Sequence, residues 1–199
     1  MRAPERLALH DRAEDNLRYI RETMARAGSF TSVSGRGMMH AGVVGFVATL
    51  ASLRYPYASQ PVVWSAIWIV AAIVAAVLSS LAIRKKSLRT GESLLGGPAR
   101  RFVLAFAPAL VAGAILTAVL VARGLYVLLP GAWLTLYGAA VTAGGTFSAR
   151  PVPVMGATFM ALGAVCLLTD PTWQPYYLAG GFGLLHVGVG YRIARYHGG

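Results

Sequence analysis

The sequence predicts an all-α membrane protein, a six-transmembrane-helix bundle preceded by a cytoplasmic N-terminal amphipathic helix. Hydrophobic residues make up 56% of the 199 residues and charged residues 13%, which is about half the charged share of a typical soluble domain. The apolar residues are concentrated in runs of 16 to 23 residues, and about 20 apolar residues in a helix cross a bilayer core of about 30 Å. The basic residues flank these runs, and they lie before the first run, between runs and at the end of the last one. Together the three features indicate a multi-pass membrane protein.

Residues 1–37 form the first expected unit, a polar cytoplasmic region with a helix over residues 4–27. The apolar residues that recur there at helical spacing include Leu9, Leu17, Ile20 and Met24. Residues at this spacing share one face of a helix. Two interpretations of the face stay open. The helix lies at the membrane interface or under the bundle, or it docks a cytosolic protein or a second copy of the chain.

Residues 38–199 form the second expected unit, the bundle. Its six spans are predicted at about 38–53, 62–83, 102–122, 125–147, 151–168 and 176–192. If the spans alternate in direction, sixteen of the 18 basic residues fall on one side and only Arg54 and Arg123 on the other. Short loops rich in Lys and Arg stay in the cytoplasm. The sequence therefore predicts a bacterial inner-membrane protein with both termini cytoplasmic.

A basic connection separates the second and third expected spans. Its basic residues are Arg84, Lys85, Lys86, Arg89, Arg100 and Arg101. A net charge of +11 would suggest nucleic-acid binding in a soluble protein. Here the charges flank apolar segments, where they attract anionic lipid headgroups. We therefore expect these six residues to contact anionic lipids at the cytoplasmic face, and we expect no direct contact with nucleic acid.

A stripe of small residues runs along the fourth expected span. Its members are Gly131, Thr135, Gly138, Thr142 and Gly145. Small residues let helix backbones approach closely in lipid, so tight helix packing is the first interpretation. The alternative is a cavity lined by the two threonine hydroxyls. Pro108 in the third span is expected to kink that helix or to free a carbonyl group, which is compatible with either interpretation.

One ionisable side chain lies well inside an expected span. No Asp or Glu falls in any span interior, which disfavours ion-coupled transporters because they commonly bind the ion with a buried carboxylate. The ionisable side chain inside a span is that of His186. It is either a neutral histidine bonded to a neighbouring helix or, with His40, a candidate ligand for a haem or metal. The prediction is that the protein holds no cofactor and no metal.

The chain contains no recognisable catalytic constellation. Outside the N-terminal region and Glu92 the only acid is Asp170, which is expected on the outer side, far from His186. We therefore predict a protein that is not an enzyme, a sensor, anchor or regulator that docks a partner through its N-terminal helix. The alternative is a transporter or channel for a small solute. A homo-oligomer is compatible with both.

The N-terminal segment also carries a resemblance. Residues 16–24 read NLRYIRETM, and residues 28–37 read GSFTSVSGRG directly before the first span. This segment resembles the start of a group of uncharacterised bacterial six-span membrane proteins, closely over about 20 residues and by architecture alone beyond them. The resemblance implies no activity, cofactor or catalytic residue, but it implies that the helix and its linker are a defining part of the protein.

The layout is similar to that of a second group. Bacterial membrane anti-sigma factors also place a short cytoplasmic region before six spans, and they hold a transcription factor through that region. The likeness is one of layout only, and topology does not determine function.

Overall fold

The computed structural model describes residues 16, 17, 20, 33–91 and 97–196. Within these ranges every regular element is a helix and no strand occurs. Five helices are long and apolar enough to cross a membrane, Gly35–Arg54, Pro61–Arg89, Gly97–Ala122, Tyr126–Gly145 and Pro151–Leu168. The chain is all-helical, and its five apolar helices fit a multi-pass membrane protein.

The elements follow one another with short connections. In chain order they are α2 (Gly35–Arg54), α3 (Pro61–Thr90), α4 (Gly97–Ala122), the 3-10 turn η1 (Tyr126–Leu128), α5 (Leu129–Gly145), α6 (Pro151–Leu168), the 3-10 turn η2 (Pro171–Trp173), α7 (Gln174–Leu178), the π-helix η3 (Ala179–Leu185) and α8 (His186–Tyr196). The last three are contiguous, so the chain is helical without a break from residue 174 to 196.

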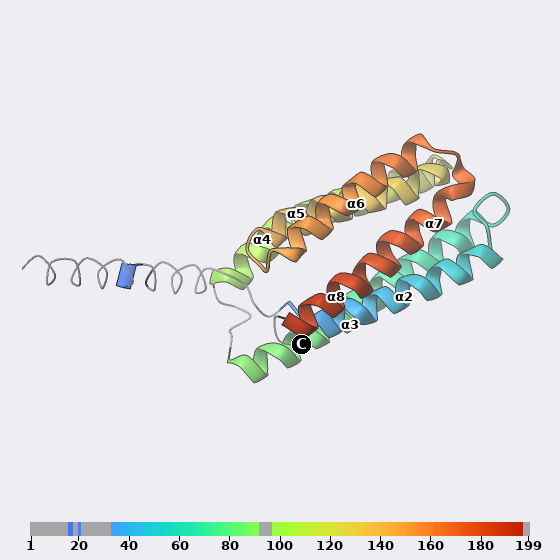
Figure 1. The fold of residues 1–199 in the computed structure, drawn as a ribbon. Coiled ribbons are helices and arrows are strands. Elements are labelled where there is room, and N and C mark those ends of the chain that lie inside the picture. The colour runs from blue at the N-terminus through green and yellow to red at the C-terminus, as the bar shows by residue number, and fades with distance from the viewer. Residues whose placement is uncertain (1–15, 18–19, 21–32, 92–96, 197–199) are drawn as a thin grey trace, which may run out of the picture.

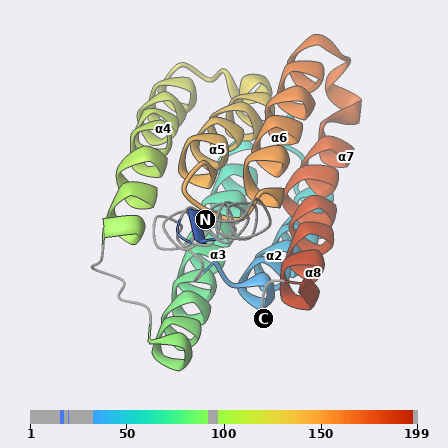
Figure 2. The same cartoon turned by 60° about the vertical axis from the view of Figure 1, so that its left-hand side comes forward.

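The helices form two layers of three (Figure 1). In one layer α2 packs between α3 and the stretch formed by η3 and α8, and in the other layer α5 packs between α4 and α6. Figure 2 shows α4, α5 and α6 side by side in the second layer. Contacts within a layer far exceed contacts between layers. The outer helices α3 and α4 expose most of their apolar side chains, as helices that face lipid do.

Local sequence explains where the helices begin and end. Proline is the first or second residue of α3, α5 and α6, where its missing N–H costs nothing. Before α2, the Ser34 hydroxyl oxygen accepts a hydrogen bond from the Gly37 N–H at 3.2 Å, which caps the helix. Gly91 follows α3 and Gly124 follows α4, with φ of 69° and 70°, a conformation that favours glycine.

Several helix boundaries differ from those of the expected spans, and α4, for example, begins at Gly97 instead of near residue 102. The second span was expected to end at residue 83, but α3 continues through the basic residues to Thr90. Lys and Arg are good helix formers, so a basic segment that leaves the membrane can stay helical. The sixth expected segment begins near residue 174 and contains a π-helix, which the apolar pattern does not reveal. In contrast, α6 begins and ends at the expected residues.

Glycine brings α5 and α6 into close contact. A Cβ on Gly156 would overlap the backbone nitrogen and Oγ1 of Thr142, and a Cβ on Gly163 would overlap Thr135. From the other side, a Cβ on Gly138 would lie 2.7 Å from the carbonyl oxygen of Gly156. Real Cβ atoms do not approach this closely, so only glycine permits this helix spacing. The small-residue stripe is therefore a helix–helix contact with α6.

The same device joins α2 to the last helical stretch. A Cβ on Gly42 would lie 2.8 Å from the carbonyl oxygen of Gly183, and a Cβ on Gly190 would lie 2.7 Å from that of Gly35. The two helices lie at opposite ends of the described chain. Their contact closes the first layer.

Candidate functional site

His186 and Tyr137 form a hydrogen-bonded pair between the two layers. Tyr137 belongs to α5, and its hydroxyl oxygen lies 2.7 Å from Nε2 of His186. His186 is 5% exposed and begins α8 directly after the π-helix. Its Nδ1 lies 3.4 Å from the carbonyl oxygen of Gly181 in that π-helix. Because π-helical turns occur frequently at functional sites, this pair is the first candidate site.

The partners of His186 favour one protonation pattern. A carbonyl oxygen can only accept a hydrogen bond, so Nδ1 carries the proton that faces Gly181. In the neutral ring Nε2 is then an acceptor, and the Tyr137 hydroxyl donates to it. Both ring nitrogens are occupied. A metal ion or a haem iron at Nε2 would have to displace the Tyr137 hydroxyl.

Five further aromatic rings adjoin this pair, and we call the seven rings together the interlayer cluster. They are Trp64 and Trp68 from α3, Trp133 and Tyr137 from α5, Phe159 from α6, and Phe182 and His186 from η3 and α8. Each adjoining pair of rings has centroids 5.0 to 6.4 Å apart, within the range in which aromatic pairs attract beyond simple burial. The cluster is the main side-chain connection between the layers.

The tryptophans of the cluster differ in their hydrogen bonds. Trp64 and Trp133 stack with centroids 5.4 Å apart and planes at 4°. The Trp133 Nε1–H donates to Thr117 Oγ1 on α4 at 2.8 Å. The Trp68 Nε1–H is buried and has no hydrogen-bond partner among the described residues. Trp64 and Trp68 are both buried in this cluster.

The threonines of the stripe do not line a cavity. The Thr135 Oγ1–H donates to the Gly131 carbonyl and the Thr142 Oγ1–H to the Gly138 carbonyl, each at 2.8 Å. Both hydroxyls thus bond within their own helix while α6 covers that face. Gly131 and Gly145, the ends of the stripe, contact Leu167 and Pro153 of α6. Pro108 is exposed on α4, which continues past it to Ala122.

The two histidines proposed as haem or metal ligands occupy different environments. His40 is exposed on α2 and lines a pocket beside basic residues, whereas His186 is buried in the interlayer cluster. Within the described ranges no three His, Cys, Asp or Glu side chains are grouped so that they could hold a metal ion. A shared site for His40 and His186 therefore has no geometric support.

Of the residues predicted to dock a partner, the structure describes two. Leu17 and Ile20 are helical and are 53% and 50% exposed. They are three residues apart, the spacing at which two residues of one helix share a face. Leu9 and Met24 lie outside the described residues.

The six basic residues predicted to contact lipid headgroups separate into two kinds. Arg84, Lys85, Arg89, Arg100 and Arg101 are exposed. Lys86 is only 8% exposed, and its Nζ donates to the Val33 carbonyl oxygen at 3.1 Å. This position differs from the predicted headgroup contact because the segment before α2 packs over that side of α3. Lys86 therefore joins α3 to the chain entering α2.

At the opposite end of the bundle the connection between α2 and α3 lies near the connection between α6 and η2. Tyr57, between α2 and α3, packs edge-on against Trp64 with centroids 5.6 Å apart. Burial, and to a smaller extent the Asp170 carboxylate, raises the pKa of Tyr57. Asp170 caps η2, and its Oδ1 accepts hydrogen bonds from the hydroxyl and the backbone N–H of Thr172 at 2.7 and 2.9 Å. These bonds lower the pKa of Asp170.

Sequence reasoning identified His186 but not its surroundings. Tyr137 is adjacent to Gly138 of the stripe, yet its hydroxyl reaches His186 in the other layer while its ring packs against Phe159 of α6. The one available signal was its place in the sequence, a hydroxyl-bearing aromatic residue in the middle of an apolar span. The Gly180–Gly181–Gly183 run was equally visible, but glycine runs do not distinguish a π-helix from an α-helix.

Comparison with known proteins adds no relative. No protein-family model matches the sequence, and no curated protein and no solved structure matches it.

Proposed function

We propose that this chain is a non-enzymatic, six-span protein of the bacterial inner membrane that docks a partner through its N-terminal helix. In this proposal α7, η3 and α8 together form the sixth span. They contain 5, 7 and 11 residues without a break, enough for the roughly 20 residues that a crossing needs. The bundle anchors the helix and holds it at the cytoplasmic face.

One observation carries the docking role. Leu17 and Ile20 are helical, are three residues apart and are each about half exposed. Large apolar side chains at this spacing are what an amphipathic helix inserts into a partner's groove. The face is suited to bind a cytosolic protein or a second copy of this chain.

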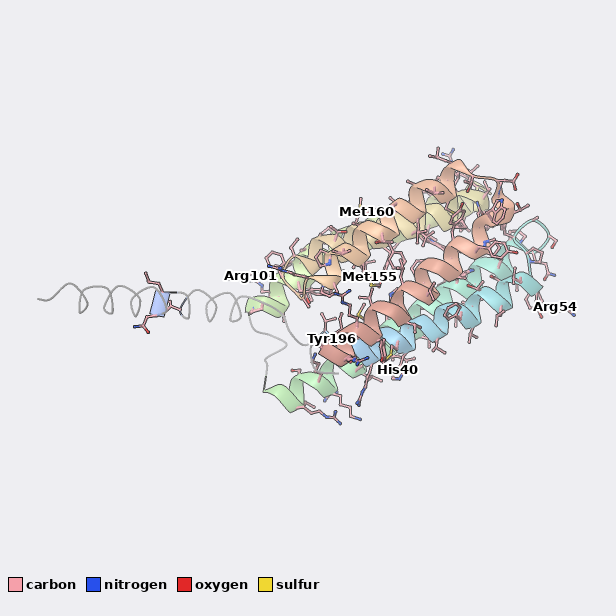
Figure 3. All side chains as sticks on the ribbon, viewed as in Figure 1. His40, Arg54, Arg101, Met155, Met160 and Tyr196 are labelled. Atoms are coloured by element: carbon pink, nitrogen blue, oxygen red, sulfur yellow. The ribbon has the colours of Figure 1, made fainter. Side chains whose placement is uncertain are left out.

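The distribution of charge supports the orientation. Arg101 and Tyr196 lie at one end of the bundle and Arg54 at the other (Figure 3). The end with Arg101 also carries the basic residues of α3. Arg54 is the last residue of α2 and Arg123 directly follows α4, so both lie at the other end. The positive-inside rule assigns the more basic end to the cytoplasm.

The test compares three full-length chains in native membranes, the wild type, Leu17→Asp/Ile20→Asp and Asn16→Asp. Asn16 is helical and exposed, so its variant adds a negative charge beside the apolar face without altering that face. We expect a specific partner, or self-association measured by light scattering, in the wild type and Asn16→Asp and its loss in the double variant. Equal membrane levels show that insertion is intact. Retention of the partner by the double variant would refute docking through this face.

A second candidate is a transporter or channel for a small neutral solute. The observation that favours it is the buried His186–Tyr137 pair beside a π-helix, between layers that share few contacts. It predicts glycerol or urea flux into proteoliposomes that falls when His186 is changed to Ala. Flux no faster than in protein-free liposomes would exclude these solutes, and the close α5–α6 contact makes a route along the stripe the less favoured one.

A further inference from the structure

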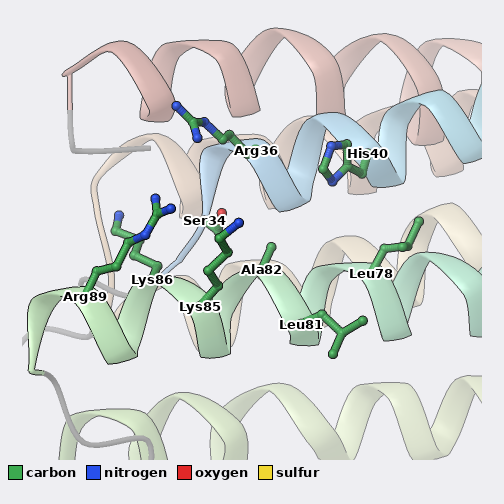
Figure 4. A pocket seen from close by; sticks show the side chains of 9 residues that line it. All are labelled: Ser34, Arg36, His40, Leu78, Leu81, Ala82, Lys85, Lys86 and Arg89. Atoms are coloured by element: carbon green, nitrogen blue, oxygen red, sulfur yellow. The ribbon is translucent and has the colours of Figure 1, made fainter.

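A basic pocket opens between the start of α2 and the last turns of α3 (Figure 4). Its volume is about 440 Å³, within the range of small-molecule sites. Four of its lining residues are cations: Arg36 from α2, and Lys85, Lys86 and Arg89 from α3. Among the described residues that line it, none is acidic. The positive charge of its lining therefore favours an anionic ligand.

Several features favour a phosphate group as that anion. Arg and Lys donate several charge-assisted hydrogen bonds to phosphate oxygens. Lys86 is nine-tenths buried and is held by its bond to the Val33 carbonyl, so its charge has a fixed place in the wall. Ser34, the N-cap of α2, also lines the pocket, which places the positive end of the helix dipole there.

The remaining wall is apolar. Leu78, Leu81 and Ala82 line the pocket one and two turns before Lys85 and Lys86 on α3, and Leu78 and Ala82 point to the same side of the helix as the lysines (Figure 4). Leu81 is exposed on the surface of a helix that faces lipid. A phosphate ion alone would use only the cationic part of the pocket. A ligand with a phosphate at one end and an apolar chain at the other would use both parts.

We propose that this pocket binds the phosphate group of an anionic amphiphile. The phosphate lies between Arg36, Lys85 and Arg89, and the apolar chain leaves along Leu78 and Leu81. This is narrower than a general attraction of the basic end to the bilayer, because Arg84, Arg100 and Arg101 are exposed near the same face but do not line the pocket. A phospholipid and free phosphate share the anionic group, so the experiment includes both.

The test uses the full chain in a mild neutral detergent and measures bound ligand by native mass spectrometry. The probes are dioctanoyl phosphatidic acid, dioctanoyl phosphatidylcholine and inorganic phosphate. The variant Lys85→Gln/Arg89→Gln removes two exposed charges from the pocket. The matched control, Arg100→Gln/Arg101→Gln, removes two exposed charges from α4 and leaves the pocket intact. Lys86 is not changed, because it also joins two segments of the fold.

We expect one tightly bound phosphatidic acid on the wild type and on the α4 control. In the pocket variant its affinity falls by roughly tenfold to thirtyfold. Phosphatidylcholine, whose headgroup carries no net charge, binds more weakly to all three chains. If inorganic phosphate displaces the lipid and its binding depends on Lys85 and Arg89 in the same way, the anion site is confirmed. Its ligand is then a soluble phosphate instead of a lipid. An equal loss of lipid affinity in both variants, or a loss in neither, would refute the proposal that this pocket binds the lipid phosphate.

Discussion

The Tyr137 hydroxyl lies 2.7 Å from Nε2 of His186, across the boundary between two three-helix layers. Each layer is held together internally by close helix contacts, and few other side-chain hydrogen bonds cross between them. The pair is buried among aromatic rings, where an unpaired ring nitrogen has no water to bond. It therefore fixes how one layer sits on the other.

Changing Tyr137 to Phe removes this hydrogen bond and leaves His186 Nε2 buried without a partner. We expect a loss of about 1 to 3 kcal/mol in the free energy of unfolding, measured by SDS titration of the protein in mild detergent. Tyr191→Phe is the control, because the Tyr191 hydroxyl is exposed and only accepts a bond from Arg195 at 3.3 Å. Equal effects of the two variants would show that the buried pair contributes nothing special.

The glycine contact between α5 and α6 predicts a sharp contrast between two Gly→Ala substitutions. At Gly156 the new methyl group overlaps Thr142, so the helices must separate, at a cost of about 1 to 3 kcal/mol. At Gly188 nothing lies within 4 Å of the new methyl, and Ala stabilises a helix by roughly 0.5 to 1 kcal/mol relative to Gly. The same SDS titration measures both. A stable Gly156→Ala protein would disprove the close contact.

The unequal hydrogen bonds of Trp68 and Trp133 give a third prediction. Both lie in the interlayer cluster, and changing either to Phe removes a similar volume. Trp133→Phe also loses the bond to Thr117, whereas Trp68→Phe removes a donor that has no described partner. We expect Trp133→Phe to be the more destabilising by about 1 kcal/mol. The reverse order of the two unfolding free energies would contradict this hydrogen-bond assignment.

Asp170 predicts a dependence on pH in the acid range. The Thr172 hydrogen bonds hold its pKa in the folded protein below the unfolded value. Its contribution to stability is therefore present above the unfolded pKa and is lost as the pH falls through the folded pKa. Asp170→Asn should lower thermal stability at neutral pH and flatten its decline in acid.

Thr172→Ala provides the control for this prediction, because it removes the Thr172 hydroxyl and keeps the carboxyl group. It should raise the Asp170 pKa and shift the acid decline to higher pH without abolishing it. Stability curves that coincide for the wild type and both variants would show that the η2 cap does not contribute.

The helical fold could be predicted because its signals are local. Run length and flanking proline are sufficient for α6, where Pro151 begins the helix and Leu168 ends it as expected. For the segment that follows Ile83, local signals mislead. Its charges suggest a loop, but nothing in Arg84 to Arg89 breaks a helix, and α3 continues. Composition alone does not separate a basic loop from a basic helix end.

The candidate sites could not be predicted because they depend on contacts between distant residues. Tyr137 and His186 are 49 positions apart, and periodicity does not indicate which buried aromatic residue meets a buried histidine. Lys85 and Lys86 are neighbours in sequence, yet one is exposed and the other bonds to Val33. That difference arises only when the chain before α2 returns over α3.

The contact between α2 and α8 has a consequence for how the protein is made. The glycine face of α2 receives its partner only after every other described helix has been synthesised. In contrast, α5 and α6 are consecutive and can pair as a hairpin while the ribosome is still translating. During that interval α2 must be shielded by lipid or by the insertion machinery. Biogenesis of the first layer thus ends with its earliest and latest helices joining.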